Sequence, residues 1–176
     1  MLYQWVDFHT TAYLLAAPLA MLLNRKLSGA FRGEQALLNR LFAAAALGSL
    51  LLLSLEIFRA CSSEDEMERY GLINRATGPY WWAFWSMIAA YGLAQLFWLR
   101  RLQHSTAVAA SCLVLQSVTL LFPLLLPLLP GRDYLPSSWM MFSYQQLFLV
   151  PLAGLMLLEA ILLRRLLAWL RRSYSR

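Results

Sequence analysis

Five long apolar runs dominate the sequence and restrict what the chain can fold into. A segment that crosses the hydrocarbon core of a bilayer, about 30 Å thick, needs about 17–25 mostly apolar residues. Backbone groups in lipid must be satisfied within their own segment, so such runs cross as α-helices. The runs cover residues 8–24, 41–58, 80–99, 107–130 and 143–163. The sequence therefore predicts an all-α integral membrane protein, built as a bundle of five transmembrane helices.

The composition agrees with this prediction. Hydrophobic residues make up 60% of the 176-residue chain and charged residues 14%. Soluble domains are about 45–50% apolar and about 25% charged. Because no Pro-, Gly- or Ser-rich linker divides the chain, we expect a single transmembrane domain over residues 1–176.

Basic residues gather after the first, third and fifth runs. They are Arg25, Lys26, Arg32 and Arg40, then Arg100 and Arg101, then Arg164, Arg165, Arg171, Arg172 and Arg176. Basic residues in the other loops are diluted by acidic ones. By the positive-inside rule we expect the N-terminus outside and the C-terminus in the cytoplasm. Membrane orientation thus accounts for the net charge of +6, and we expect no nucleic-acid partner.

Charged side chains within the runs are candidate functional residues. Glu56 and Arg59 lie three residues apart near the outer end of the second run, so they share a helix face. Glu56 is only about one turn from the boundary. Two interpretations therefore stay open, a structural ion pair and a role with protons or quinol. Glu159 lies near the inner end of the last run, close to Arg164, and is interpreted as a charge that snorkels to the interface.

Uncharged polar and small residues indicate helix packing. Gln116 is the member nearest mid-membrane of a polar stripe on the fourth run, so we expect it to form interhelical hydrogen bonds. Ala44 and Gly48 have the spacing that allows close approach of a neighbouring helix. Trp82 belongs to an aromatic cluster that opens the third run. This cluster is interpreted either as an interfacial belt or as the lining of a quinone-sized cleft.

The histidines argue against a haem held by this chain alone. A haem with two histidine ligands needs one on each side of a single iron. His9 lies near the outer end of the first run, whereas His104 lies in an inner loop. Cys61 and Cys112 are widely separated and form no metal-binding motif. We therefore expect no cofactor or metal bound by this chain alone.

Two outer-loop segments resemble a known family. Residues 74–82 read NRATGPYWW and residues 132–139 read RDYLPSSW. Together they resemble the polysulfide-reductase membrane-subunit (NrfD-like) family, and most of all the ten-helix quinol-oxidising subunit of bacterial alternative complex III. Residues 54–58 (SLEIF) and 7–11 (DFHTT) resemble neighbouring parts of the same family.

The resemblance covers the C-terminal half of the family's ten helices, and it has departures. Leu121 and Phe122 stand where the family has a Glu-Arg pair, and Arg59 intrudes after the family's glutamate. The N-terminal bundle that holds the family's quinol pocket is absent from the matched region. The resemblance thus implies a membrane subunit of a quinol-oxidising respiratory complex in the bacterial inner membrane, with mainly a scaffold role and no catalytic residues of its own.

The resemblance also implies partners and candidate residues. The expected partners are a ten-helix NrfD-like subunit, periplasmic iron–sulfur and cytochrome c subunits, a neighbouring terminal oxidase, and lipids. A quinone would lie at an interface between subunits. The candidate quinone or proton residues are His9, Glu56, Arg59, Arg75 and Trp82. The candidate packing or interface residues are Gln116, Arg132, Asp133 and Trp139.

Two other functions stay open. The chain could be one half of a split NrfD-like subunit, contributing to a quinone site or proton path that a partner completes. A small transporter is the third alternative. Transporters place charge or broken helices at mid-membrane, whereas here only uncharged polar groups reach that depth.

Overall fold

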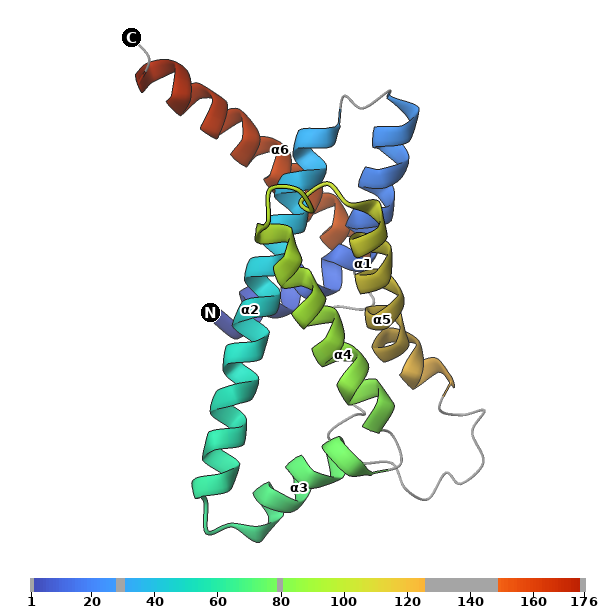
Figure 1. Cartoon of the computed structure of the whole chain (residues 1–176), viewed down its shortest axis with the longest axis vertical. Coiled ribbons are helices and arrows are strands. Elements are labelled where there is room, and N and C mark those ends of the chain that lie inside the picture. Colours follow the sequence, from blue (N-terminus) through green and yellow to red (C-terminus); the bar gives the residue numbers. More distant parts are fainter. Residues whose placement is uncertain (1, 28–30, 79–80, 126–148, 175–176) are drawn as a thin grey trace.

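The computed structural model describes residues 2–27, 31–78, 81–125 and 149–174, and these form helices joined by short turns (Figure 1). The helices are α1 (Leu2–Lys26), α2 (Arg32–Ser62), α3 (Glu66–Thr77), α4 (Trp81–Ala94), the 3₁₀-helix η1 (Gln95–Trp98), α5 (Thr106–Leu125) and α6 (Leu149–Tyr174). The prediction of an all-α protein is confirmed for these residues.

Within the described ranges, two helices are long and apolar enough to cross a membrane, α1 and α2. They contain the first two predicted runs. The α2 helix has 31 residues, which corresponds to about 46 Å at the rise of an α-helix. Neither helix carries a charged residue in the middle of its apolar stretch. Both therefore have the long apolar stretch from which the sequence predicts a membrane-crossing helix.

The predicted bundle of five transmembrane helices is wrong, because the other runs do not form helices of that kind. The α4 helix has only 14 residues, about 21 Å, before the chain tightens into η1 and turns. In α5, residues 106–118 form a shorter apolar helical segment that is not counted as a membrane span. In α6 every span-length window of the described residues includes Arg164 and Arg165. Residues 80, 126–130 and 143–148 of the predicted runs lie outside the described residues.

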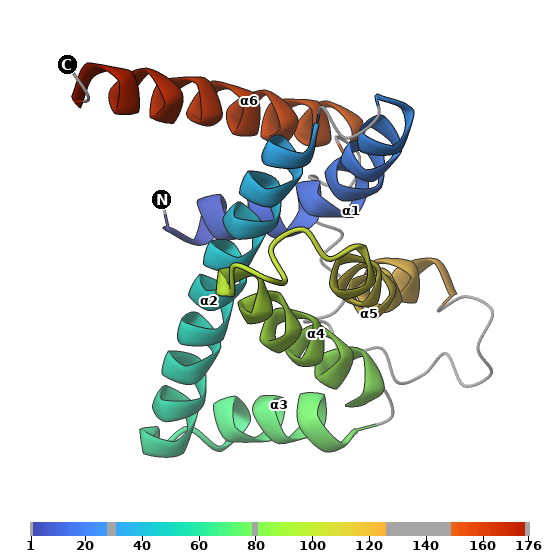
Figure 2. The ribbon, with the colours of Figure 1, turned by 45° about the horizontal axis from the view of Figure 1, so that its top comes forward.

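The helices also do not stand side by side as a parallel bundle. Figure 1 shows α2, α3 and α4 as the three sides of a triangle, with α3 joining the ends of the other two. Figure 2 shows α6 crossing the upper end of α2 at a large angle, so that its C-terminal half projects beyond the other helices.

The core lies where α1 and α2 cross and where α4, α5 and α6 pack onto them. Tyr13 and Phe42 stack there with ring centroids 3.9 Å apart and planes 6° from parallel. The Tyr13 hydroxyl donates to Asn39 Oδ1 at 2.8 Å, and Asn39 Nδ2 donates to the Gln103 carbonyl at 2.9 Å. Buried alanines on α1, α2, α5 and α6 complete this core, because small side chains allow helices to approach closely.

The α3 helix replaces what the sequence predicts to be a loop. It begins at an N-cap, Asp65, whose side chain accepts a hydrogen bond from the backbone N–H of Met67 at 2.9 Å. Glu66 and Glu68 lie in its first turn and Arg75 in its last, an arrangement that the helix dipole favours. These local signals stabilise a short helix that bridges α2 and α4.

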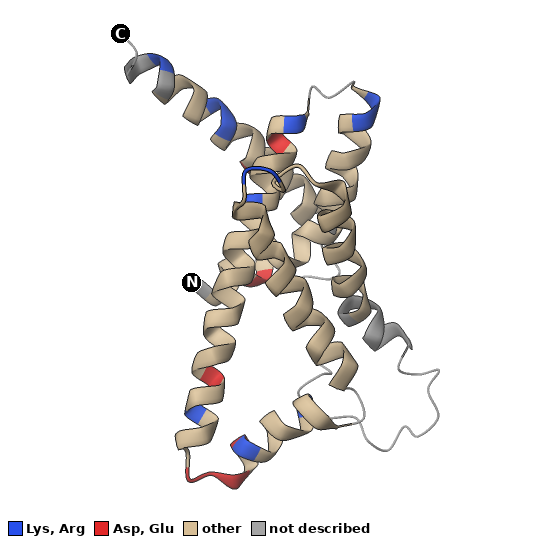
Figure 3. Cartoon of the chain, in the orientation of Figure 1, with Lys and Arg blue, Asp and Glu red and all other residues tan. Residues whose placement is uncertain are grey.

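The charges separate between the two ends of the molecule (Figure 3). Lys and Arg predominate at the end where α1 meets α2 and where α6 projects. Acidic residues gather at the opposite end, around the turn from α2 to α3. The clustering of basic residues at one end agrees with the asymmetry seen in the sequence.

Candidate functional site

A cleft of about 520 Å³ lies inside the triangle of α2, α3 and α4, where the N-terminal part of α1 closes one wall. Its lining combines an apolar wall with a small set of polar groups. The apolar wall includes Val6, Leu52, Leu53, Phe84 and Met87, and the polar groups are Asp7, Thr10, Ser49, Glu56, Arg75 and the phenols of Tyr3 and Tyr91. Such a combination is typical of small-molecule sites, which measure about 300–1,000 Å³.

An ion pair between two helices forms the polar side of the cleft. Arg75 Nη2, from the last turn of α3, donates to Glu56 Oε1 on α2. Both side chains are partly shielded, with 25% of Arg75 and 46% of Glu56 exposed. The pair forms because α3 folds back along α2. It therefore fixes both a positive donor and a carboxylate at the edge of an apolar space.

The structure pairs the predicted residues differently from the sequence interpretation. Arg59 does not pair with Glu56. Its Nη2 lies 2.9 Å from Glu68 Oε1, and 78% of the Arg59 side chain is exposed. A second cavity of about 340 Å³ adjoins the cleft and shares Glu56 and Arg75 with it, with Arg59 at its rim. Arg75 is therefore the ion-pair partner of Glu56, a role that the sequence interpretation gave to Arg59.

Hydroxyl groups cover the inner part of the cleft. The Thr10 hydroxyl donates to the Val6 carbonyl at 2.9 Å, within α1. The Tyr91 phenol and the Ser49 hydroxyl line the cleft beside Thr10. Gln116 on α5 donates to the Thr10 carbonyl, an interhelical hydrogen bond of the kind that the sequence predicts. Hydrogen-bond donors thus meet here from α1, α2 and α4, with α5 bracing the wall.

His9 faces away from the cleft, toward α6. It is buried, and its Nε2 lies 2.9 Å from Glu159 Oε2 while its Nδ1 lies 2.8 Å from the Trp5 carbonyl. The interpretation of Glu159 as a charge that snorkels beside Arg164 is therefore wrong. Arg164 instead pairs with Glu34 on α2. The sequence did not indicate the His9–Glu159 contact, because the two residues belong to opposite ends of the chain.

The remaining candidates are not brought to the cleft. Trp82 is half-buried on α4 and is not among the residues that line the cleft. Arg132, Asp133 and Trp139 lie outside the described residues. Within the described part of the chain, no group of three His, Cys, Asp or Glu residues is placed to hold a metal ion.

Comparison of the chain with protein-family models, with curated proteins and with solved structures found no match. The resemblance to the NrfD-like family therefore stays a prediction from the two loop segments.

Proposed function

We propose that this chain is a membrane subunit of a quinol-oxidising respiratory complex of the alternative complex III type, and that its cleft holds a quinone head group. The cleft carries this proposal. It sets the Glu56–Arg75 pair and a group of hydroxyls against an apolar wall. Its volume and lining favour a contribution to a quinone site, as in a split subunit, over a purely scaffolding role.

The lining suits the chemistry of a quinone. A quinone ring presents two carbonyl oxygens that accept hydrogen bonds, and Arg75, Ser49 and Tyr91 provide donors. Oxidation of a quinol to a quinone releases two protons and two electrons. Glu56 and Asp7 are carboxylates placed to accept protons. The electrons would pass to a redox centre on a partner, such as an iron–sulfur or cytochrome c subunit, so this chain would not be catalytic alone.

The location that we propose is a bacterial inner membrane, crossed more than once by helices that include α1 and α2. Exposed apolar side chains support contact with lipid or with helices of a larger NrfD-like partner. On α2 they form a ridge at Leu47, Leu51, Leu55 and Phe58, of which 43%, 59%, 64% and 72% is exposed. Their spacing places them on one face of the helix. A terminal oxidase would be a further neighbour in the same assembly.

Photolabelling tests the cleft. The full chain, extracted in mild detergent, is irradiated with an azido-quinone and the labelled peptides are mapped. We expect label on α2 and α4 near Ser49, Glu56 and Tyr91, lost when excess unlabelled quinone competes. Glu56→Gln should reduce the labelling severalfold. Glu64→Gln removes an acidic residue that does not line the cleft and should leave it unchanged.

Label that excess quinone does not displace, or that spreads evenly over all exposed helices, would reject the quinone site. The subunit role is tested separately, by mass spectrometry of the proteins that co-purify after gentle extraction. We expect an NrfD-like subunit together with iron–sulfur and cytochrome c subunits.

A further inference from the structure

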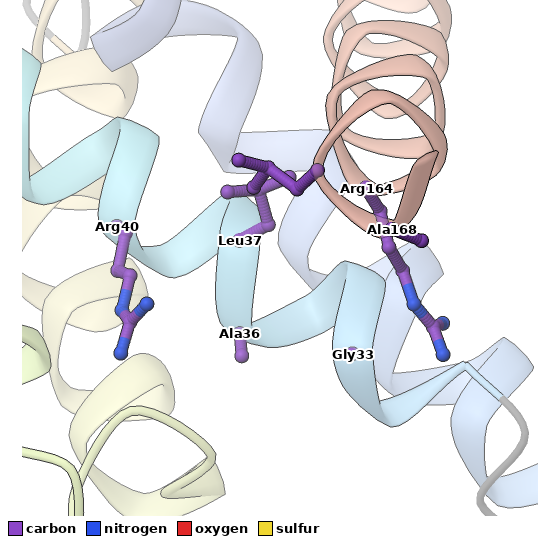
Figure 4. A pocket seen from close by; sticks show the side chains of 7 residues that line it. Gly33, Ala36, Leu37, Arg40, Arg164 and Ala168 are labelled. Carbon is purple, nitrogen blue, oxygen red and sulfur yellow. The ribbon is translucent and has the colours of Figure 1, made fainter. Parts of the chain in front are cut away.

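A further cavity, of about 220 Å³, lies at the basic end of the molecule, between α2 and α6 (Figure 4). Gly33, Ala36 and Leu37 from α2 form one wall. Leu167 and Ala168 from α6 form the other. The walls are apolar, yet two arginines flank them. The cavity is therefore small, apolar at its base and positively charged at its rim.

The two arginines reach the cavity from different helices. Arg164 lies against the backbone of α2 at Gly33, where an added Cβ would be only 2.7 Å from Arg164 Cζ. Arg40 lies seven residues farther along α2, which is two helical turns or about 10 Å. Figure 4 shows the two guanidinium groups extended to the same side, with Ala36 between them. The glycine thus leaves room for Arg164 to lie against α2 at Gly33.

The charges at this cavity do not balance. Arg164 pairs with Glu34, whereas Arg40 donates to the neutral amide oxygen of Gln103. The Nε of Arg40 is buried and has no hydrogen-bond partner among the described residues. Of the two guanidinium groups at this cavity, only that of Arg164 is paired with a carboxylate, and a buried N–H of Arg40 stays available. An anion placed between the arginines would use both features, since a guanidinium binds phosphate oxygens through paired N–H groups.

The C-terminal half of α6 extends the same surface. We name residues 162–174 the basic arm. Arg164, Arg165 and Arg172 have the spacing that places them on one arc of this helix. Leu162, Leu166 and Trp169 fall on another arc, and 55%, 50% and 62% of these side chains is exposed. A helix with arginines on one arc and leucine and tryptophan on another is typical of one that lies in a membrane interface.

We propose that the cavity between Arg40 and Arg164 binds the phosphate head group of an anionic phospholipid, while the basic arm lies along the lipid surface. The arginines donate to the phosphate oxygens, and the first carbons of the acyl chains pack on Leu37 and Leu167. Basic pockets between membrane helices are known to bind such head groups. This site lies away from the quinol cleft, goes beyond the proposed quinol role and requires only that the chain lies in a membrane.

Lipid titration tests the site. The full chain in mild detergent is titrated with phosphatidylglycerol or phosphatidylcholine. Bound lipid is counted by native mass spectrometry, and the thermal midpoint is followed in parallel. We expect phosphatidylglycerol to bind at least about tenfold more tightly than phosphatidylcholine, because the latter cancels its phosphate charge. Inorganic phosphate at the same concentration should leave the midpoint unchanged, because it lacks acyl chains.

Variants locate the binding. Arg40→Gln should weaken phosphatidylglycerol binding about tenfold. Arg59→Gln removes an exposed arginine at the opposite end and should leave it unchanged. Glu34→Gln removes the carboxylate that competes for Arg164, so it should strengthen binding. This variant gives an answer even where Arg40→Gln fails to fold.

Equal binding of the two lipids, equal effects of Arg40→Gln and Arg59→Gln, or weaker binding in Glu34→Gln would each overturn the proposal. A midpoint raised by inorganic phosphate as much as by phosphatidylglycerol would indicate a free-anion site and would reject the lipid as ligand.

Discussion

The imidazole Nε2 of His9 lies 2.9 Å from the Glu159 carboxylate, although 150 residues separate the two side chains. His9 Nδ1 lies 2.8 Å from the Trp5 carbonyl, which can only accept a hydrogen bond, so this nitrogen carries a proton. The contact between Nε2 and Oε2 therefore also needs a proton between them, held by one or the other. The pair joins α1 to α6. It gives the buried His9 Nε2 a hydrogen-bond partner, which apolar neighbours could not provide.

This proton leads to a matched pair of substitutions. Glu159→Gln keeps a donor, because the amide N–H can donate to Nε2, so we expect the free energy of unfolding to change by less than about 0.5 kcal/mol. Glu159→Leu leaves the buried Nε2 without a partner and should cost about 1–3 kcal/mol. Thermal or denaturant unfolding in detergent measures both. Equal losses in the two variants would show that the charge of Glu159, and not its hydrogen bond, stabilises the contact.

Gly48 on α2 should tolerate no added side chain where α1 approaches it. A Cβ at this position would lie 2.8 Å from Val6 Cγ2, and Val6 is buried. We expect Gly48→Ala to destabilise the protein by about 1–3 kcal/mol, the usual cost of overpacking.

Gly92→Ala is the control, because nothing lies within 4 Å of a Cβ added there. It should be neutral or stabilise α4 by about 0.5–1 kcal/mol, since alanine favours a helix more than glycine does. Thermal midpoints of the two variants would be measured side by side. A stabilising Gly48→Ala would show that α1 and α2 separate at this point.

Asp65 should determine whether α3 forms, and with it the position of Arg75. Removing an N-cap side chain typically costs about 0.5–2 kcal/mol of helix stability, so Asp65→Ala should loosen α3 without unfolding the core. We expect faster amide hydrogen exchange across residues 66–77 and a weaker Glu56–Arg75 contact. Asp65→Asn keeps an oxygen that can accept the hydrogen bond and should exchange like the natural protein. Unchanged exchange in Asp65→Ala would mean that packing on α2 and α4 stabilises α3 instead.

The stability of the protein should fall below neutral pH because of His104. Burial, and then the positive charge of Arg32, lower the pKa of His104 from its ordinary value of 6.5. The folded state thus binds the proton less readily than the unfolded chain. The contribution is fully present above pH 6.5 and is lost as the pH falls through the lowered pKa.

Thermal midpoints measured between pH 8 and pH 5 check this prediction. His104→Gln has no titrating ring and should flatten the dependence in the slightly acidic range, although carboxylates still contribute at lower pH. The prediction would be contradicted if the natural protein became more stable from pH 7.5 to pH 6 and His104→Gln removed that gain.

Local patterns along the sequence determined the helical class and the two helices, α1 and α2, that are long and apolar enough to cross a membrane. The run at residues 8–24 has no charged residue, and the run at 41–58 has only Glu56, near its end. Such long apolar runs satisfy their backbone groups in lipid only as helices. Those properties are contained in the run itself, so α1 and α2 agree with the prediction. The interhelical role of Gln116 follows in the same way, because a polar group on an apolar helix needs a partner on a neighbour.

Tertiary structure decided which charged groups meet. Glu56 pairs with Arg75 and not with Arg59, because α3 folds back along α2, whereas helical spacing considers only residues on the same helix. Glu159 meets His9 because α6 crosses α1, a contact between opposite ends of the chain. The five-helix bundle failed for a related reason. The sequence of an apolar run indicates that the run is buried, but not whether lipid or other helices bury it. Here α4 and α6 pack on α1 and α2, and only the assembled fold determines their lengths and crossing angles.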